Sequence, residues 1–275
     1  MAHIVAVANQ KGGVGKTTTA VNLSAALAAA EVKTLIIDMD AQANASSGLG
    51  ISAQPLESSV YAALEGTLDI SRLIHPTAMP KLDLIPSGPD LYGIDIHLAG
   101  IEEPLTRLTR CLEDIQTAYD VILIDCPPSL SLLTLNGLSA ANSVLIPLQC
   151  EYYALEGLSQ LLRTIELVRA GPNPGLAIEG LLLTMFDGRN NLARQVELDV
   201  RNNFGDQVFS TMIPRNVRLS EAPSFGKPIV LYDIHSRGSK SYLELAQEFL
   251  SKSGPATTHY TMPAKAEINE NECRG

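Results

Sequence analysis

Residues 10–18 of the chain read Gln10-Lys11-Gly12-Gly13-Val14-Gly15-Lys16-Thr17-Thr18. The apolar run 4–8 precedes this stretch, and the Ala-rich segment 17–30, which has high helix propensity, overlaps its end. Glycines at a strand-to-helix turn let backbone N–H groups face an anion, and the positive end of the helix adds to the attraction. We therefore expect residues 11–18 to bind the phosphates of a nucleotide, with Lys16 on the β- and γ-phosphates and the Thr17 hydroxyl on Mg²⁺.

The apolar runs on either side of this loop predict the fold class. Runs of strand length lie at 4–8, 34–38, 82–86, 121–125, 143–148, 180–185, 208–214 and 229–232. Helical stretches are expected at 17–30, 102–119, 154–170, 192–204 and 239–250. Continuous apolar runs are typical of strands buried on both faces, and their alternation with helices predicts a doubly wound α/β fold with a mostly parallel sheet and helices on both faces. Ligands of such sheets bind beyond the carboxyl ends of the strands.

Composition excludes several classes of protein. The chain has 275 residues, 45% of them apolar, which is enough for a large core without disulfides. There is no long apolar span and no secretory signal, and the four cysteines form no CxxC pair, so we expect a cytoplasmic protein. Residues 1–250 are interpreted as one domain. The polar, Pro-containing stretch 251–275 has no periodicity and is interpreted as a flexible tail.

Three carboxylates follow two of the predicted strands. Asp38 and Asp40 are two residues apart at the end of 34–38, so both side chains point the same way if the strand continues. Asp125 ends the apolar run 121–125, the Walker B arrangement in which an acid at the sheet edge holds Mg²⁺. All three are therefore expected beside the phosphate loop.

The loop departs from the general G-x-x-x-x-G-K-[ST] pattern, because Gln10 replaces the first glycine and Lys11 follows it. In this it resembles the deviant Walker ATPases, the P-loop group that contains ParA/Soj partition proteins, MinD and nitrogenase iron protein. The stretch 38–42 is similar to that group's DxDPQ motif with Ala41 for Pro, and 125–129 reads DCPPS, as in partition ATPases. The resemblance covers about residues 2–250.

The resemblance implies roles for individual residues. Lys11 would reach the nucleotide of a second subunit, so that ATP holds a homodimer together. Asp40 would position the attacking water, and Asp38 and Asp125 would hold Mg²⁺. Met185, Pro214 and Asn216 follow later apolar runs and would wall the adenine, although ordinary strand-end loops remain an alternative.

The charge distribution bears on nucleic acid as a partner. The net charge is −10, yet residues 31–156 carry five basic and seventeen acidic residues, whereas 215–240 carry five basic and two acidic ones. In partition ATPases this later region binds DNA without sequence preference. The positional matches are Arg189, Arg218, Lys227 and Arg237, each of which could instead belong to an ordinary solvated face.

The implied function is a ParA/Soj-type ATPase for chromosome or plasmid partitioning, associated with the nucleoid and stimulated by a ParB/Spo0J-type centromere-binding protein. A ParA-like ATPase that positions a protein cargo shares every motif and stays open. A MinD-like membrane switch needs a basic amphipathic C-terminal helix, which the final AEINENECRG does not provide, so no membrane partner is expected. An iron-protein reductase needs paired cluster cysteines, and Cys126 is interpreted as a small packed residue.

Overall fold

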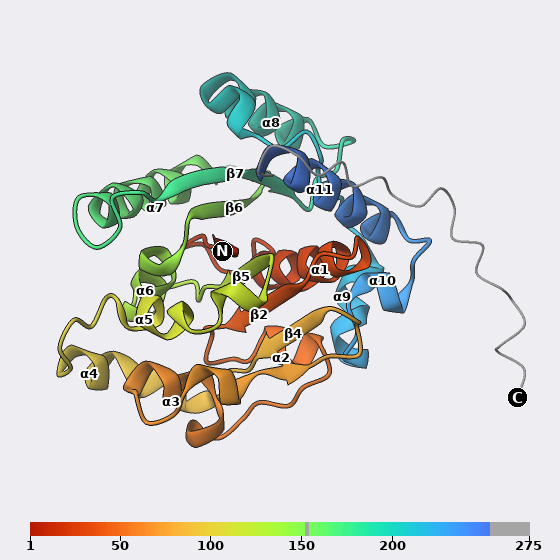
Figure 1. The fold of residues 1–275 in the computed structure, drawn as a ribbon. Helices are drawn as coiled ribbons and strands as arrows, with labels where there is room; N and C mark the ends of the chain where they lie inside the picture. Colours follow the sequence, from red (N-terminus) through yellow and green to blue (C-terminus); the bar gives the residue numbers. More distant parts are fainter. Residues whose placement is uncertain (152–153, 254–275) are drawn as a thin grey trace, which may run out of the picture.

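The sheet at the centre of the molecule has the predicted parallel character. The computed structural model describes residues 1–151 and 154–253, and within these residues seven strands form one sheet in the order β3-β4-β2-β5-β1-β6-β7 (Figure 1). All neighbours are parallel except the short edge pair β3 and β4. The strands are β1 (His3–Val7), β2 (Thr34–Asp38), β3 (His75–Pro76), β4 (Leu82–Ile85), β5 (Val121–Asp125), β6 (Ser143–Gln149) and β7 (Ala177–Thr184).

Alternate side chains of each strand enter two separate cores. In β1, Val5 and Val7 pack on one face of the sheet, and Ile4 and Ala6 pack on the other. Both faces must therefore be covered by helices, which explains why the strands read as continuous apolar runs in the sequence. The predicted doubly wound α/β fold is confirmed.

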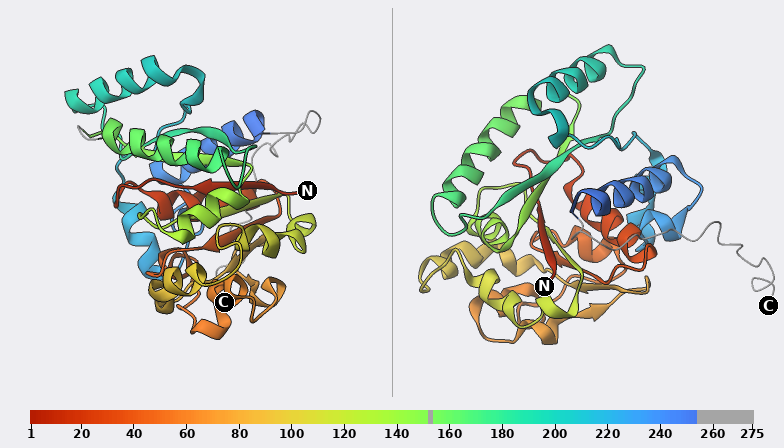
Figure 2. Two further views of the ribbon diagram at one scale, coloured as in Figure 1. Left: turned by 90° about the vertical axis from the view of Figure 1, so that its left-hand side faces the viewer. Right: turned by 45° about the horizontal axis from the view of Figure 1, so that its top comes forward.

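Helices cover the two faces (Figures 1 and 2). α1, α10 and α11 supply residues to one core, and α3 to α8 supply residues to the other. The helices are α1 (Lys16–Ala29), α2 (Asn44–Gly48), α3 (Val60–Glu65), α4 (Ile94–Ala99), α5 (Arg107–Glu113), α6 (Leu132–Ala140), α7 (Ala154–Arg169), α8 (Asn191–Phe204), α9 (Val217–Glu221), α10 (Ile229–Tyr232) and α11 (Arg237–Ser253).

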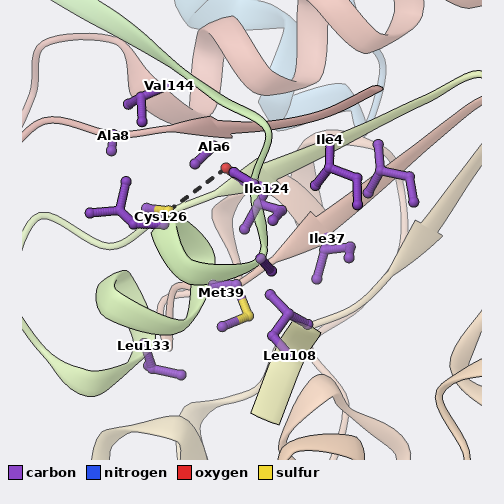
Figure 3. Close-up of a cluster of buried hydrophobic side chains, with 14 of the residues drawn as sticks. Ile4, Ala6, Ala8, Ile37, Met39, Leu108, Ile124, Cys126, Leu133 and Val144 are labelled. Atoms are coloured by element: carbon purple, nitrogen blue, oxygen red, sulfur yellow. Dashed lines mark hydrogen bonds between the residues drawn. The ribbon is translucent and has the colours of Figure 1, made fainter. Parts of the chain in front are cut away.

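Cys126 lies inside the core beneath β1, β2 and β5. Figure 3 shows it among Ala6, Ala8 and Ile124, and its side chain is 1% exposed. Burial raises the pKa of this thiol, so it stays protonated and apolar in character. Cys126 is thus a packed residue, as the sequence indicated.

Two of the predicted strands are wrong. Residues 229–232 form α10, because a four-residue apolar run does not by itself distinguish a strand from a helical turn. Residues 208–214 run beside β7 without forming a continuous strand. Val208 makes an isolated bridge with Leu181, and the N–H groups of Phe209 and Ile213 donate to the carbonyls of Leu181 and Leu183 at 2.9 Å each. The backbone N–H groups of Ser210 and Thr211 donate to the carboxylate of Glu248 instead of to a strand, at 2.7 and 2.8 Å.

The expected helix 102–119 is shorter than predicted. Pro104 lies near its start, Glu103 has a φ of 51°, and α5 begins only at Arg107. A short 3₁₀ turn, Gln116–Ala118, follows α5. The left-handed backbone at Glu103 prevents helical hydrogen bonding from an earlier start.

The expected tail begins later than residue 251, because α11 continues to Ser253. Lys252 holds this last turn, since its Nζ lies 4.5 Å from the centroid of the Phe209 ring and 3.4 Å from a Glu248 oxygen. The rest of the predicted tail, 254–275, is outside the described residues. Within the described part, no helix combines the length and apolarity needed to cross a bilayer.

Candidate functional site

The phosphate loop and two carboxylates meet at one edge of the sheet because three strands end level with one another. Asp125 at the end of β5 is the register partner of Val7 in β1 and of Asp38 in β2. The chain leaves β1 at Val7 and enters the loop 10–15. Parallel register therefore places Asp38 and Asp125 side by side next to the loop, as predicted.

The loop is held from both sides. Asn9 accepts a hydrogen bond from the backbone N–H of Lys11 at 3.0 Å and donates to the carbonyl of Pro147 at 2.7 Å. The Thr184 hydroxyl donates to the carbonyl of Val14 at 2.8 Å. The loop is thereby fixed to β6 and β7, strands far from it in sequence.

Glycines keep the inner side of the loop clear. Gly13 and Gly15 have φ angles of 75° and 90°, which L side chains rarely adopt. No atom lies within 4 Å of where a Cβ would stand on Gly12 or Gly13. Backbone N–H groups and open space are what a bound phosphate needs.

Lys16 begins α1 and is buried, with 7% of its surface exposed. Its Nζ donates to the carbonyl of Lys11 at 3.0 Å, which curls the side chain back over the loop. Burial lowers the pKa of Lys16, while the nearby Asp125, Cys126 and Asp40 act in the opposite direction. An ammonium held in a partly dehydrated position gains strongly from a phosphate charge.

Asp125 is a buried acid that lacks close hydrogen-bond partners among the described residues, although the Thr17 hydroxyl is nearby. Among the described residues neither of its carboxylate oxygens has a partner in hydrogen-bonding geometry, and the residue is 0% exposed. Burial and the neighbouring Asp38 raise its pKa well above the usual range, and the nearby Thr17 hydroxyl and Lys16 lower it only in part. Buried polar groups normally have hydrogen-bond partners, so the unsatisfied carboxylate oxygens of Asp125 indicate a ligand site.

Asp38, by contrast, is fully engaged. One oxygen accepts from the Ser46 N–H at 2.8 Å and from the Ser46 hydroxyl at 2.7 Å, and the other accepts from the Asp40 N–H at 3.2 Å. Burial raises the pKa of Asp38 to about 6, and these hydrogen bonds oppose the rise. In this conformation Asp38 holds α2, and its place in a Mg²⁺ shell stays a prediction.

Asp40 lies at the open side of the cluster and is partly exposed. One of its oxygens accepts from the N–H of Gln42 at 3.0 Å, and the Ser87 hydroxyl donates to its backbone carbonyl at 2.6 Å. Asp40 influences both Lys16 and Asp125 electrostatically, so the structure brings these three together. A partly exposed carboxylate next to Lys16 and Asp125 suits the predicted contact with water.

The donor set fits Mg²⁺ bound together with phosphates. Thr17 and Asp125 offer hard oxygen ligands for the metal ion. Lys16 and the loop N–H groups offer positive charge and hydrogen-bond donors for the phosphates. Within the described chain no three His, Cys, Asp or Glu side chains converge to hold a metal by themselves. Mg²⁺ in nucleotide sites keeps water and phosphate ligands and needs no such cage.

Lys11 pairs with a carboxylate outside the phosphate loop. Its Nζ lies 2.8 Å from a carboxylate oxygen of Glu151, and both side chains are partly exposed, at 33% and 48%. An exposed pair of this kind is worth about 0–1 kcal/mol, so it can exchange for a stronger partner. The lysine is therefore available at the surface rather than committed to its own loop.

The three residues predicted to wall a base line one cavity. It has a volume of about 360 Å³ and adjoins the loop through Gly15 and Thr18. The lining residues also include Met185, Pro214, Asn216 and Tyr242. The structure thus brings Met185, Pro214 and Asn216 together beside the phosphate loop.

The four predicted DNA-contacting cations differ in their surroundings. Arg189 is 91% exposed and pairs with Asp187 at 2.8 Å. Arg218 pairs with Glu221 at 2.9 Å and with Asp233 at 3.5 Å. Exposed Lys227 lines a second cavity, and exposed Arg237 begins α11.

These cations lie on neighbouring segments. Residue 186 pairs with 214 through backbone hydrogen bonds, so the loop that carries Arg189 runs beside the start of α9. Arg218 and Lys227 belong to the packed unit of α9, the 3₁₀ turn η6 (Ala222–Phe225) and α10 (Figure 1). Carboxylates pair with Arg189 and Arg218 in the structure. The count of charged residues in the sequence did not reveal this pairing.

Comparison with known proteins identifies the family. Residues 2–178 match the family model described as an AAA domain. The chain is 56% identical over 253 residues to the chromosome partitioning protein ParA of Myxococcus xanthus, covering 92% of this chain and 89% of that protein. It is 54% identical over 248 residues to the sporulation initiation inhibitor protein Soj of Bacillus subtilis, covering 90% of this chain and 98% of Soj. The chain belongs to the ParA/Soj family of chromosome-partitioning ATPases.

Solved structures support the ParA/Soj fold. A cobyrinic acid a,c-diamide synthase of Mycobacterium smegmatis, solved with bound ADP and magnesium, superposes with a TM-score of 0.80 at 37% identity, covering 93% of this chain and 97% of that one. A putative plasmid partition protein of Borrelia burgdorferi, solved with bound AMPPNP, superposes with a TM-score of 0.79 at 26% identity, covering 92% and 100%.

Several residues of the site were not found from the sequence. Ser46 donates to the Asp38 carboxylate and Ser87 to the Asp40 carbonyl. Glu151 pairs with Lys11, and Tyr242 of α11 lines the cavity that also holds Met185, Pro214 and Asn216. The Tyr242 hydroxyl lies 3.3 Å from the Thr19 hydroxyl of α1. No local pattern marks these residues, because each acts through a partner distant in the chain.

Lys16→Gln should abolish nucleotide binding, because it removes the buried ammonium that faces the phosphates. Lys33→Gln, which changes an exposed lysine at the opposite edge of the sheet, should bind nucleotide as the wild type does. Isothermal titration calorimetry with ATP and Mg²⁺ measures both. Undiminished affinity in Lys16→Gln would show that the phosphate loop is assigned wrongly.

Asp125→Asn should stabilise the nucleotide-free protein at pH 8. The folded pKa of Asp125 is raised above the unfolded value, so ionisation of the folded state costs stability as pH rises above about 4. The amide carries no charge, and we expect a gain of about 1–3 kcal/mol at pH 8 that shrinks towards pH 4. Urea unfolding at both pH values, with exposed Asp114→Asn as the control, tests this. Equal effects at the two pH values would contradict it.

Proposed function

We propose that this protein is a slow partitioning ATPase whose ATP-bound homodimer binds DNA without sequence preference. The carrying observation is the unpartnered, buried Asp125 beside Lys16 and an open glycine loop. Such an arrangement is unfavourable until Mg²⁺ and phosphates complete it. The ADP, magnesium and AMPPNP in related structures support ATP and Mg²⁺ as the ligands here.

ATP supplies the phosphoryl group, and Mg²⁺ offsets the charge on its phosphates. Lys16 and the loop N–H groups bind the β- and γ-phosphates, and Thr17 and Asp125 hold the metal. Asp40, on the open side of the cluster, orients the attacking water. Met185, Pro214 and Asn216 enclose the adenine in the cavity of about 360 Å³.

Lys11 completes the site of a second subunit in this proposal. Its ammonium is at the surface and held by a single exposed carboxylate, Glu151. A cation delivered across an interface neutralises charge that develops during phosphoryl transfer, as an arginine finger does. ATP therefore stabilises the dimer. Hydrolysis removes the phosphate charge that attracts Lys11 across the interface.

DNA binding is assigned to the surface that carries Arg189, Arg218, Lys227 and Arg237. Two such surfaces held in one dimer gain avidity, whereas a single acidic monomer binds weakly. A ParB-type partner would release the DNA by stimulating hydrolysis. The partitioning names of the relatives from Myxococcus and Bacillus favour a chromosome as cargo.

An Asp40→Ala variant should bind DNA with ATP and bind it much more weakly with ADP, because it retains nucleotide but lacks the water-positioning carboxylate. Contacts to phosphates make the affinity fall steeply with salt. Fluorescence anisotropy with a labelled duplex at several salt concentrations measures both effects. Equal binding with ADP, or affinity independent of salt, would refute the proposed function.

Lys11→Ala should keep ATP binding and lose the ATP-dependent dimer. Lys81→Ala is a matched control, since Lys81 is also exposed and paired with a carboxylate, that of Glu31. Size-exclusion chromatography with light scattering in the presence of ATP separates the two outcomes. Normal dimerisation of Lys11→Ala would exclude a role across the interface.

A further inference from the structure

Two glycines from distant parts of the chain are in direct backbone contact. A Cβ placed on Gly226 would lie 2.8 Å from the Cα of Gly50, and a Cβ placed on Gly50 would lie 3.0 Å from the carbonyl oxygen of Gly226. Both residues have positive φ angles, 61° and 80°. The two turns therefore touch with no side chain between them.

Gly50 belongs to the turn that ends α2, and α2 is held by the nucleotide site. The N–H and hydroxyl of Ser46 in α2 both donate to Asp38, as described above. Ser46 is fully buried, and the Gly50 N–H donates to the carbonyl of Ser47 at 3.0 Å. Through these hydrogen bonds, Asp38 is linked to α2 and to the turn at Gly50.

Gly226 lies within the proposed DNA-binding surface. It separates Phe225, whose side chain is 62% exposed, from exposed Lys227. The turn is joined to its neighbours, because the Phe225 ring stacks on Tyr232 at 5.0 Å between centroids and the Tyr232 hydroxyl donates to Glu221, the partner of Arg218. Movement of Gly226 would therefore displace Lys227 and the environment of Arg218 together.

The space beside this contact allows such a movement. A cavity of about 270 Å³ separates Thr17 and Thr18 of the phosphate loop from Asn44 and Ser47 of α2, and Lys227 also lines it. A backbone-to-backbone contact transmits displacement directly, because no rotamer change can absorb it.

We propose that the Gly50–Gly226 contact couples the nucleotide site to the DNA-binding surface, so that the state of the Asp38–Asp40 segment sets the position of Lys227 and Arg218. This proposal rests on the proposed function, since it concerns how ATP controls DNA binding. It adds a route for that control within one subunit, in addition to dimerisation.

Gly226→Ala tests the route. The added methyl group collides with the backbone of Gly50, so the two turns must separate. Gly205→Ala is the matched control, because Gly205 also has a positive φ of 52° but nothing lies within 4 Å of its Cβ position. DNA affinity is measured by anisotropy with ADP and with a non-hydrolysable ATP analogue, alongside nucleotide affinity, dimerisation and thermal melting.

In the wild type, exchange of ADP for the analogue should raise DNA affinity about 5- to 150-fold, the usual range of allosteric coupling. Gly226→Ala should lower this ratio severalfold, to the part that dimerisation alone supplies, while nucleotide affinity and dimerisation stay normal, and Gly205→Ala should keep the full ratio. A folded Gly226→Ala protein with the full ratio would overturn the coupling and leave the proposed function intact. A wild type without any nucleotide dependence would instead overturn the proposed function itself.

If Gly226→Ala does not fold, hydrogen exchange of the wild-type protein tests the coupling instead. The analogue, compared with ADP, should change exchange rates in residues 44–51 and in 222–228 together. A change confined to 44–51 would refute the coupling. The measurement uses the full chain with both nucleotides and needs no variant.

Discussion

The rest of the structure depends on one unfavourable arrangement, the burial of Asp125 next to Asp38 at the ends of two adjacent strands. Parallel register makes the two carboxylates neighbours, and burial raises the pKa of both. Asp38 is compensated by Ser46 and by the Asp40 N–H, whereas the oxygens of Asp125 lack close partners in the part of the chain that the structure describes. The two acids therefore differ in how far the protein satisfies their hydrogen bonds. Asp38 holds the neighbouring helix, and Asp125 is the acid that we propose for the metal ion.

The second half of the chain folds back to support the first. Thr184 holds the loop carbonyl of Val14, and Asn22 of α1 accepts from the Ile229 N–H at 2.7 Å. Tyr242 of α11 reaches Thr19 in the first turns of α1. The phosphate loop is therefore not an independent motif. Its backbone is surrounded by strands and helices that also carry the cavity lined by Met185 and Asn216 and the cationic surface.

Much of the site could be predicted because it depends on local sequence. Gly13 and Gly15 must be glycines for their backbone angles, and Asp38 and Asp125 end apolar strands, so their place at the sheet edge follows from the fold class. Residues 208–214 and 229–232 were predicted wrongly for the opposite reason. In 208–214, Glu248 accepts from the N–H groups of Ser210 and Thr211. In 229–232, α10 packs on α1 and α11. Both influences come from residues outside the segment itself.

The sequence by itself determined the phosphate loop, the strand-end acids and, through them, the family, because each is a short run whose chemistry and backbone demands are local. Only the tertiary structure decided which charges are already paired. Lys11 meets Glu151 and Arg218 meets Asp233. In the same way, the backbone of Gly50 meets that of Gly226 across more than half of the chain. These contacts join residues with no fixed spacing, and hydrogen bonds and close packing act over a few ångströms in space, whatever the separation along the chain.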